Sequence, residues 1–243
     1  EFEIAAVHST DGVTSVRKMA TRACGDELVR RKLKACAEAF LAKSVIVCEG
    51  KTELGIVRAL EEAGRAHLSL RGVAPVDANG GAEMFKLARL MNSCGYRTCV
   101  FMDSDESKYD GDKKALHSEG IQVFDWDEGM STELQVFNDV PDETVRDLIS
   151  LAVEEWDAGR VRNSLDRNGL SYDDAVNPKR DLTPEERRRI GAAAQASGGG
   201  KPWFKRIDLG EKLGKIVLGV LKSIPGSRTE TTLDGLVQWV EEE

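Results

Sequence analysis

Apolar residues recur along this 243-residue chain in two patterns, short continuous runs and longer stretches with helical spacing. Four of the short runs, at 44–49, 73–77, 97–102 and 121–126, are typical of strands covered on both faces in a parallel sheet. Stretches with helical spacing separate these runs, so strand and helix alternate. The pattern therefore predicts an α/β fold, a parallel sheet with right-handed crossovers and helices on both faces.

The sequence on either side of this alternation follows other patterns. Residues 1–21 are predicted to form a strand-rich or irregular lead-in with a turn at Asp11-Gly12, and a helix is predicted from about Gly25 to Lys43. Beyond Asp127 the spacing predicts helices at 131–138, 141–158, 172–176, 184–196, 209–222 and 230–242. We therefore divide the chain into a lead-in and helix (1–43), a sheet domain (44–127) and a helical subdomain (128–243).

Composition narrows the class of protein. The net charge of −8 argues against a protein that coats nucleic acid by bulk charge, but a nuclease needs an acidic site to hold metal. Basic residues gather at 30–34, 187–189 and 201–206, and the first two clusters are interpreted as solvated helix faces. The five cysteines have no paired metal-ligand spacing and no histidine next to them, which favours reduced packing residues over a zinc site.

Targeting signals are missing from the sequence. No apolar run approaches the roughly 20 residues that a membrane-spanning helix needs, so no membrane role is expected. The chain begins with Glu-Phe-Glu-Ile, without an initiator Met or a signal-peptide pattern, and it is interpreted as a fragment of a cytoplasmic protein.

Two acidic motifs follow predicted strands. Glu49 ends the first strand and Glu53 lies in the first turn of the next helix, whereas Asp103 and Asp105 follow the third strand. Open parallel sheets bind their ligands at the carboxyl ends of strands. Four carboxylates gathered there repel one another unless protons or cations neutralise them, and Mg²⁺ and Mn²⁺ prefer such oxygen ligands. The motifs together predict a metal-dependent enzyme that acts on phosphate.

Each motif alone has an ordinary structural explanation. Glu53 fits helix capping, and an acidic turn such as Asp103-Ser104-Asp105 is common after a strand. A P-loop is rejected, because Val45 stands where Gly-x-x-x-x-Gly-Lys-Thr requires its first glycine. The specificity lies in the combination of the two motifs, one strand–helix unit apart.

Three of these signals resemble a known family. Glu-Gly-x-Thr-Glu at 49–53, the Gly80-Gly81 turn and Asp-x-Asp at 103–105 are similar to the Toprim fold over residues 44–126, and the continuation Thr132-Glu133-Leu134 is similar to the OLD-family nucleases. The resemblance implies a Toprim sheet and metal-dependent nicking or cleavage of DNA. It carries the catalytic and metal-binding roles over to Glu49, Glu53, Asp103 and Asp105, and it implies an N-terminal ABC-type ATPase in the full-length protein.

The expected chemistry is two-metal phosphodiester hydrolysis. Two Mg²⁺ or Mn²⁺ ions activate water and stabilise the leaving oxygen, while Ca²⁺ is expected to bind without supporting turnover. Glu133 is a candidate additional metal ligand, although its place at a helix start also fits capping. The resemblance suggests a lysine that stabilises the phosphate, for which Lys205 and Lys201 are the candidates. Trp203 and Phe204 beside them either anchor this loop or stack on a base.

Other functions remain as alternatives. The best of them is a non-catalytic Toprim scaffold that uses helices 141–158 and 209–222 for assembly. The four acidic residues argue against this alternative, because a scaffold has no reason to bring repelling carboxylates together. A topoisomerase needs a nucleophilic tyrosine, and Tyr96, Tyr109 and Tyr172 lie in no winged-helix context. A primase needs zinc and nucleotide-handling elements that the sequence lacks. DNA is the expected partner, and the sequence leaves a homodimer open.

Overall fold

The computed structural model describes residues 5–10, 12–18, 36–196 and 200–242, which divide into two compact units. The sheet unit contains the described residues of 1–50, 67–101 and 108–124. The helical unit contains residues 51–66, 102–107 and the described residues from Asp125 onward. In the described ranges, none of the helices is both long enough and apolar enough to cross a membrane.

A parallel sheet forms the centre of the sheet unit. Its strands lie in the order β4-β3-β5-β6, and the elements are β3 (Ser44–Cys48), β4 (Val73–Asp77), β5 (Arg97–Phe101) and β6 (Gln122–Phe124). All five residues of β3 are buried, which explains why this strand reads as one continuous apolar run. The sequence places β4 correctly to the residue, whereas β6 is shorter than predicted because the chain leaves the sheet before Asp125.

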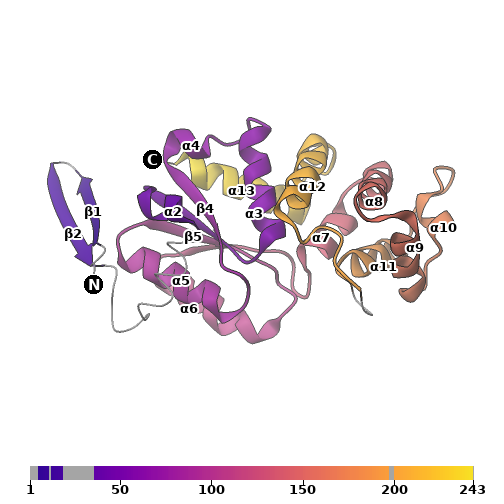
Figure 1. The fold of residues 1–243 in the computed structure, drawn as a ribbon, viewed down its shortest axis with the longest axis horizontal. Helices are drawn as coiled ribbons and strands as arrows, with labels where there is room; N and C mark the ends of the chain where they lie inside the picture. The colour runs from indigo at the N-terminus through magenta and orange to yellow at the C-terminus, as the bar shows by residue number, and fades with distance from the viewer. Residues whose placement is uncertain (1–4, 11, 19–35, 197–199, 243) are drawn as a thin grey trace. The chain divides into compact units, whose positions relative to one another are not determined.

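Helices cover this sheet on both faces. Figure 1 shows α5 (Ala82–Ser93) and α6 (Asp110–Ser118) together on one side of the sheet and α2 (Ala37–Leu41) on the other. The short helices α4 (Leu68–Arg71) and η1 (Ser107–Tyr109) complete the connections. The predicted α/β fold with helices on both faces is confirmed.

The lead-in contains an antiparallel hairpin of β1 (Ala5–Thr10) and β2 (Val13–Lys18). Gly12, in the predicted turn, has a φ of +79°, a conformation that favours glycine, and Asp11 lies outside the described residues. Of the helix predicted from Gly25 to Lys43, only α2 belongs to the described part of the chain.

The helical unit is built from one helix of the strand–helix alternation and the segments after Asp125. Its elements are α3 (Lys51–Glu62), α7 (Thr132–Asp139), α8 (Asp142–Trp156), α9 (Ala158–Arg167), α10 (Tyr172–Val176), α11 (Pro184–Ala194), α12 (Ile207–Val220), η2 (Leu221–Ser223) and α13 (Arg228–Glu241). Thr183 and Glu186 form a capping box at the start of α11, with Pro184 in the first turn of the helix. The C-terminal helical region is therefore confirmed.

Helix α9 is absent from the sequence prediction, which ran a single helix from 141 to 158. The chain breaks at Asp157, whose φ of +120° is incompatible with a continuing helix. Asp157 then caps α9 by accepting a 2.8 Å hydrogen bond from the Arg160 amide. The helix was missed because most of its residues are polar. Val161 and Leu165 are its only large apolar residues, and both are buried.

Close backbone packing joins α3 to α12. A Cβ atom on Gly55 would lie 2.4 Å from the Ile207 carbonyl oxygen, and one on Gly210 would lie 2.6 Å from the Thr52 carbonyl oxygen. One turn further along α12, a Cβ atom on Gly214 would lie 2.7 Å from the Ala59 Cβ. These distances are shorter than van der Waals contact, so only glycine permits this approach of the two helices.

We expect Gly210→Ala to destabilise the protein by roughly 1–3 kcal/mol, the range for overpacking, because its methyl group meets backbone that cannot move aside. The control is Gly219→Ala in the same helix, where a Cβ atom meets nothing within 4 Å. There the higher helix propensity of alanine should leave stability equal or raise it by up to about 1 kcal/mol. Urea unfolding of both variants measures the difference, and equal stabilities would contradict the packing argument.

Candidate functional site

The first acidic residue, Glu49, lies directly after β3 in the sheet unit. Its backbone N–H donates to the Phe101 carbonyl at 2.9 Å, and its carbonyl accepts from the Gly80 N–H at 2.8 Å. The end of β3 is therefore fixed between the end of β5 and the Gly80-Gly81 turn. The other candidate residues, from Glu53 to Lys205, belong to the helical unit.

The Thr132 hydroxyl joins two of the predicted carboxylates. Thr132 is fully buried at the first position of α7, and its Oγ1 lies 2.7 Å from Glu53 Oε1 and 2.9 Å from Asp103 Oδ1. The same oxygen accepts a 2.8 Å hydrogen bond from the Trp126 indole N–H. A hydroxyl has one proton, so Thr132 can donate to only one of the two carboxylates at a time. Glu53 and Asp103 thus converge on a single polar atom.

Asp103 is held by the N-terminus of α7. The Thr132 backbone N–H donates to Asp103 Oδ1 at 2.7 Å, and the free N–H groups of a helix start favour a negative charge. The Ser131 side chain caps the same helix by accepting from the Leu134 N–H at 3.2 Å. Helix α7 therefore orients one oxygen of Asp103 through both its backbone and a side chain.

The turn that carries both aspartates is anchored through Ser104. The Ser104 N–H donates to the Met130 carbonyl, and the Gly129 N–H donates to the Ser104 carbonyl, each at 2.9 Å. The Ser104 hydroxyl donates to Asp125 Oδ2 at 3.1 Å. Asp105 is exposed and accepts a 3.0 Å hydrogen bond from the Gln195 amide at the end of α11. The two aspartates are therefore supported from different helices.

Glu133 is a buried acid beside these groups. Burial raises the pKa of its carboxyl to about 7, and the negative charges of Asp103 and Asp105 add to the rise. A backbone hydrogen bond and the positive charge of Lys205 act in the opposite direction. Glu133 is therefore close to half-protonated at neutral pH, and it senses two carboxylates and one lysine of the predicted site.

The loop with the two candidate lysines is anchored by its aromatic residues. Trp203 and Phe204 are fully buried. The Trp203 backbone N–H donates to the Ala194 carbonyl at 2.8 Å, and the Thr52 hydroxyl donates to the Phe204 carbonyl at 3.3 Å. The two rings therefore anchor the loop, and the base-stacking alternative is wrong for this arrangement. Lys205 and Lys201, on either side of these anchors, are exposed.

The donor chemistry fits a hard divalent cation better than it fits zinc. Glu53, Asp103, Asp105 and Glu133 supply carboxylate oxygens, and no cysteine or histidine joins them. Within the described ranges, no group of three or more His, Cys, Asp or Glu side chains is arranged so that it could hold a metal ion. Glu53 and Asp103 share the Thr132 hydroxyl instead.

The sequence did not reveal three of the residues that organise this site. Thr132 bridges two carboxylates, Trp126 donates to Thr132, and Gln195 donates to Asp105. The sequence singled out Thr132 only as part of the continuation Thr132-Glu133-Leu134, which gave no sign that its hydroxyl contacts two carboxylates. For Trp126 the signal was general, because a buried indole N–H usually has a hydrogen-bond acceptor.

Comparisons with known proteins agree with the sheet and its acidic motifs. Residues 40–105 match the family model described as "Overcoming lysogenization defect protein-like, TOPRIM domain". None of the curated proteins matches the chain. Among solved structures, the C-terminal region of the Burkholderia pseudomallei OLD protein is 17% identical, with a TM-score of 0.44 over 80% of this chain and 98% of that one.

A second solved structure gives similar values. The C-terminal region of the Xanthomonas campestris pv. campestris OLD protein is 18% identical, with a TM-score of 0.42 over 76% of this chain and 99% of that one. The motif Glu49-Gly-Lys-Thr-Glu53 and the acidic turn from Asp103 to Asp105 both fall inside the range that the family model matches. Residues 40–105 are therefore similar to the Toprim domain of OLD-like proteins.

Proposed function

We propose that this chain is the catalytic region of a metal-dependent DNA endonuclease, the nuclease half of a protein that also contains an N-terminal ABC-type ATPase. The observation that carries the proposal is the convergence of Glu53 and Asp103 on Thr132, with the buried Glu133 beside them. A structural role alone gives no reason to bring acids together in a buried place, where each of them raises the cost of ionising the others.

The proposed roles follow from the positions of the side chains. Glu53, Asp103, Asp105 and Glu133 would hold the ions, and Glu49 at the end of β3 is proposed as a further ligand. Two Mg²⁺ or Mn²⁺ ions, when bound, supply an activated water and stabilise charge on the leaving oxygen. Thr132 and the N-terminus of α7 orient Asp103, and Trp126 fixes the Thr132 hydroxyl.

Lys205 is the proposed electrostatic stabiliser of the scissile phosphate. The positive charge of Lys205 acts to lower the pKa of Glu133, which supports this choice, whereas the Lys201 carbonyl accepts a hydrogen bond from Arg160 of α9. A cation that faces the phosphate stabilises the charge that develops in the transition state. We further propose that the protein works in the cytoplasm, and that Ca²⁺ binds at the same carboxylates without supporting turnover.

Millimolar Mg²⁺ or Mn²⁺ should raise the melting temperature, because an ion that binds only the folded state stabilises it by RT ln(1 + [L]/Kd). A hundredfold excess over Kd corresponds to roughly 5–10 °C for a chain of this size. Glu53→Gln and Asp103→Asn should lose most of this shift together with Mn²⁺-dependent nicking of supercoiled plasmid. The control is Glu154→Gln on the exposed face of α8, which should keep both. Absence of nicking with every ion would favour the scaffold alternative.

Lys205→Met should lower the nicking rate by about 10²-fold, in the range observed when one charge-stabilising donor is removed. The metal-induced rise in melting temperature should remain, because lysine is not a metal ligand. Lys215→Met, which removes an exposed lysine of α12 paired with Glu62, is the matched control and should nick at the wild-type rate. Wild-type nicking by the Lys205 variant would show that the loop is structural.

Glu133→Gln should change how stability depends on pH in metal-free buffer. The folded pKa of Glu133 is about 7 and its ordinary value is 4.5, so burial favours the protonated form. The contribution of Glu133 to wild-type stability is therefore greatest below pH 4.5 and falls by roughly 3 kcal/mol as the pH rises through 7.

The variant does not titrate at this position, so its stability relative to wild type should increase over the same pH range. Urea unfolding in EDTA at pH 4.5, 6 and 8 measures this difference. A constant difference between the two proteins would contradict the raised pKa.

A further inference from the structure

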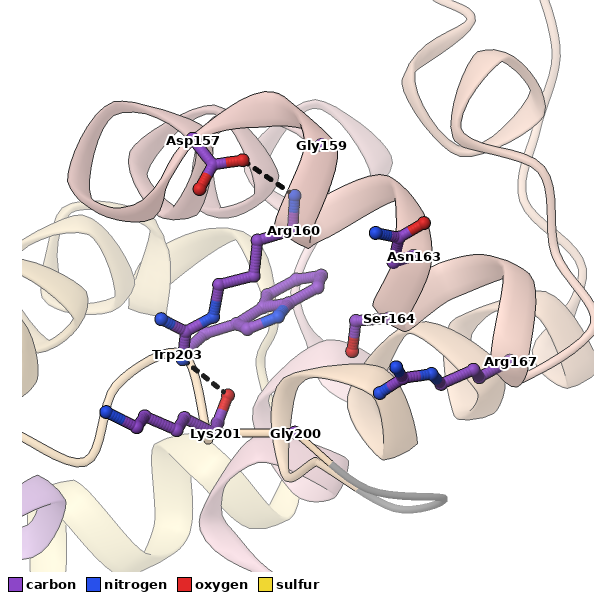
Figure 2. A pocket seen from close by; sticks show the side chains of 9 residues that line it. All are labelled: Asp157, Gly159, Arg160, Asn163, Ser164, Arg167, Gly200, Lys201 and Trp203. Atoms are coloured by element: carbon purple, nitrogen blue, oxygen red, sulfur yellow. Dashed lines mark hydrogen bonds between the residues drawn. The ribbon is translucent and has the colours of Figure 1, made fainter.

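The helical unit contains a pocket of about 660 Å³ that none of the proposed catalytic steps uses. Helix α9 provides one wall and the segment from Gly200 to Trp203 provides the opposite wall (Figure 2). The charged residues that line it are Asp157, Arg160, Arg167 and Lys201, three cations and one carboxylate. The pocket is therefore polar and has a positive excess.

The polar groups around the pocket are fixed by neighbouring helices. Arg160 stacks on Trp156, with its guanidinium carbon 3.9 Å from the ring centroid, and it donates to the Lys201 carbonyl at 3.1 Å. The Asp157 carboxylate accepts a hydrogen bond from the Arg160 backbone N–H and thereby caps α9. The lining therefore contains three cationic side chains and one carboxylate, and that carboxylate also caps a helix.

One buried donor in the wall needs an acceptor. The Trp203 indole N–H is buried, and no hydrogen-bond partner for it is found in the part of the chain that the structure describes. In Figure 2 the indole lies between the Arg160 side chain and Ser164, among the residues that line the pocket. An unsatisfied buried N–H is costly, and an anionic oxygen in the pocket would satisfy it.

We propose that this pocket binds a backbone phosphate of the DNA strand, away from the phosphate that is cleaved. The inference rests on the proposed nuclease function for the source of the phosphate. Two guanidinium groups and one ammonium group match the charge and the acceptor oxygens of a phosphodiester, and the indole N–H adds a neutral donor. The pocket thereby acts as a positioning site for the strand.

Lys201 borders the pocket and lies four residues before Lys205 in the same segment of chain. The pocket and the lysine proposed to face the cleaved phosphate therefore belong to one loop.

The test measures DNA binding in EDTA, so that neither the metal site nor cleavage contributes. We compare the full chain with the double variant Arg160→Gln/Arg167→Gln, using fluorescence anisotropy of a labelled 20-base-pair duplex between 50 and 200 mM KCl. The loss of about one phosphate contact makes the negative slope of log K against log[salt] shallower by about 0.9. Over this fourfold salt range, the wild-type affinity should therefore fall about 3.5-fold more than the affinity of the variant.

The matched control is Arg162→Gln, which removes an exposed arginine of the same helix that stacks on Tyr172 outside the pocket. It should keep the wild-type slope, and unchanged melting temperatures would show that all variants fold. A wild-type slope in the double variant would overturn the proposal. Absence of nicking by the wild-type chain, together with a reduced salt slope in the double variant, would instead contradict the nuclease function and leave the pocket as a DNA contact.

The Trp203 indole provides a second readout. Its ¹H–¹⁵N signal, assigned by its disappearance in Trp203→Phe, should shift when the duplex is added and stay in place in the double variant. Inorganic phosphate in excess should shift the same signal and compete with the duplex. A shift with inorganic phosphate but none with DNA would overturn the strand assignment, because the pocket would then accept only a small anion.

Discussion

The close contact between α3 and α12 is the constraint on which the helical unit depends. Helix α3 carries Glu53 in its first turn, and α12 begins directly after the loop that carries Lys205. Gly55 and Gly210 let the two backbones approach to distances that no side chain would allow. The Thr52 hydroxyl then reaches the Phe204 carbonyl, so the same helix start holds one candidate ligand and the loop with the candidate cation. A change at this contact would move both groups together.

Burial organises the acidic site and also makes it unstable without a partner. Glu53 and Glu133 have little exposed surface, so a charge on either carboxylate loses most of its stabilisation by water. One hydroxyl proton cannot satisfy two carboxylates, and the raised pKa of Glu133 shows that a proton is retained there near neutral pH. A positive charge beside these carboxylates would offset their mutual repulsion.

The sequence predicted those features that depend on local pattern. The bounds of β4 and α10 agree to the residue, because a continuous apolar run and a capped short helix are local signals. Helix α9 was missed because its polar face outweighs two apolar residues. The acidic motifs could be found from strand ends, but Thr132 lies 29 residues from Asp103 and 79 from Glu53 along the chain. Only tertiary folding brings these three together, and no local pattern encodes such a contact.

The 200–206 segment contributes lysine side chains to two places in the helical unit. Its backbone is tied to the end of α11 through Trp203 and to Trp156 of α8, whose indole N–H donates to the Trp203 carbonyl at 2.8 Å. Lys201 on one side borders the cationic pocket, and Lys205 on the other acts on Glu133. Because the aromatic anchors lie between the two lysines, neither lysine can shift far without disturbing the core. A strand held at the pocket would therefore meet Lys205 at a defined distance, and positioning of this kind lowers the entropy cost of reaching the reactive geometry.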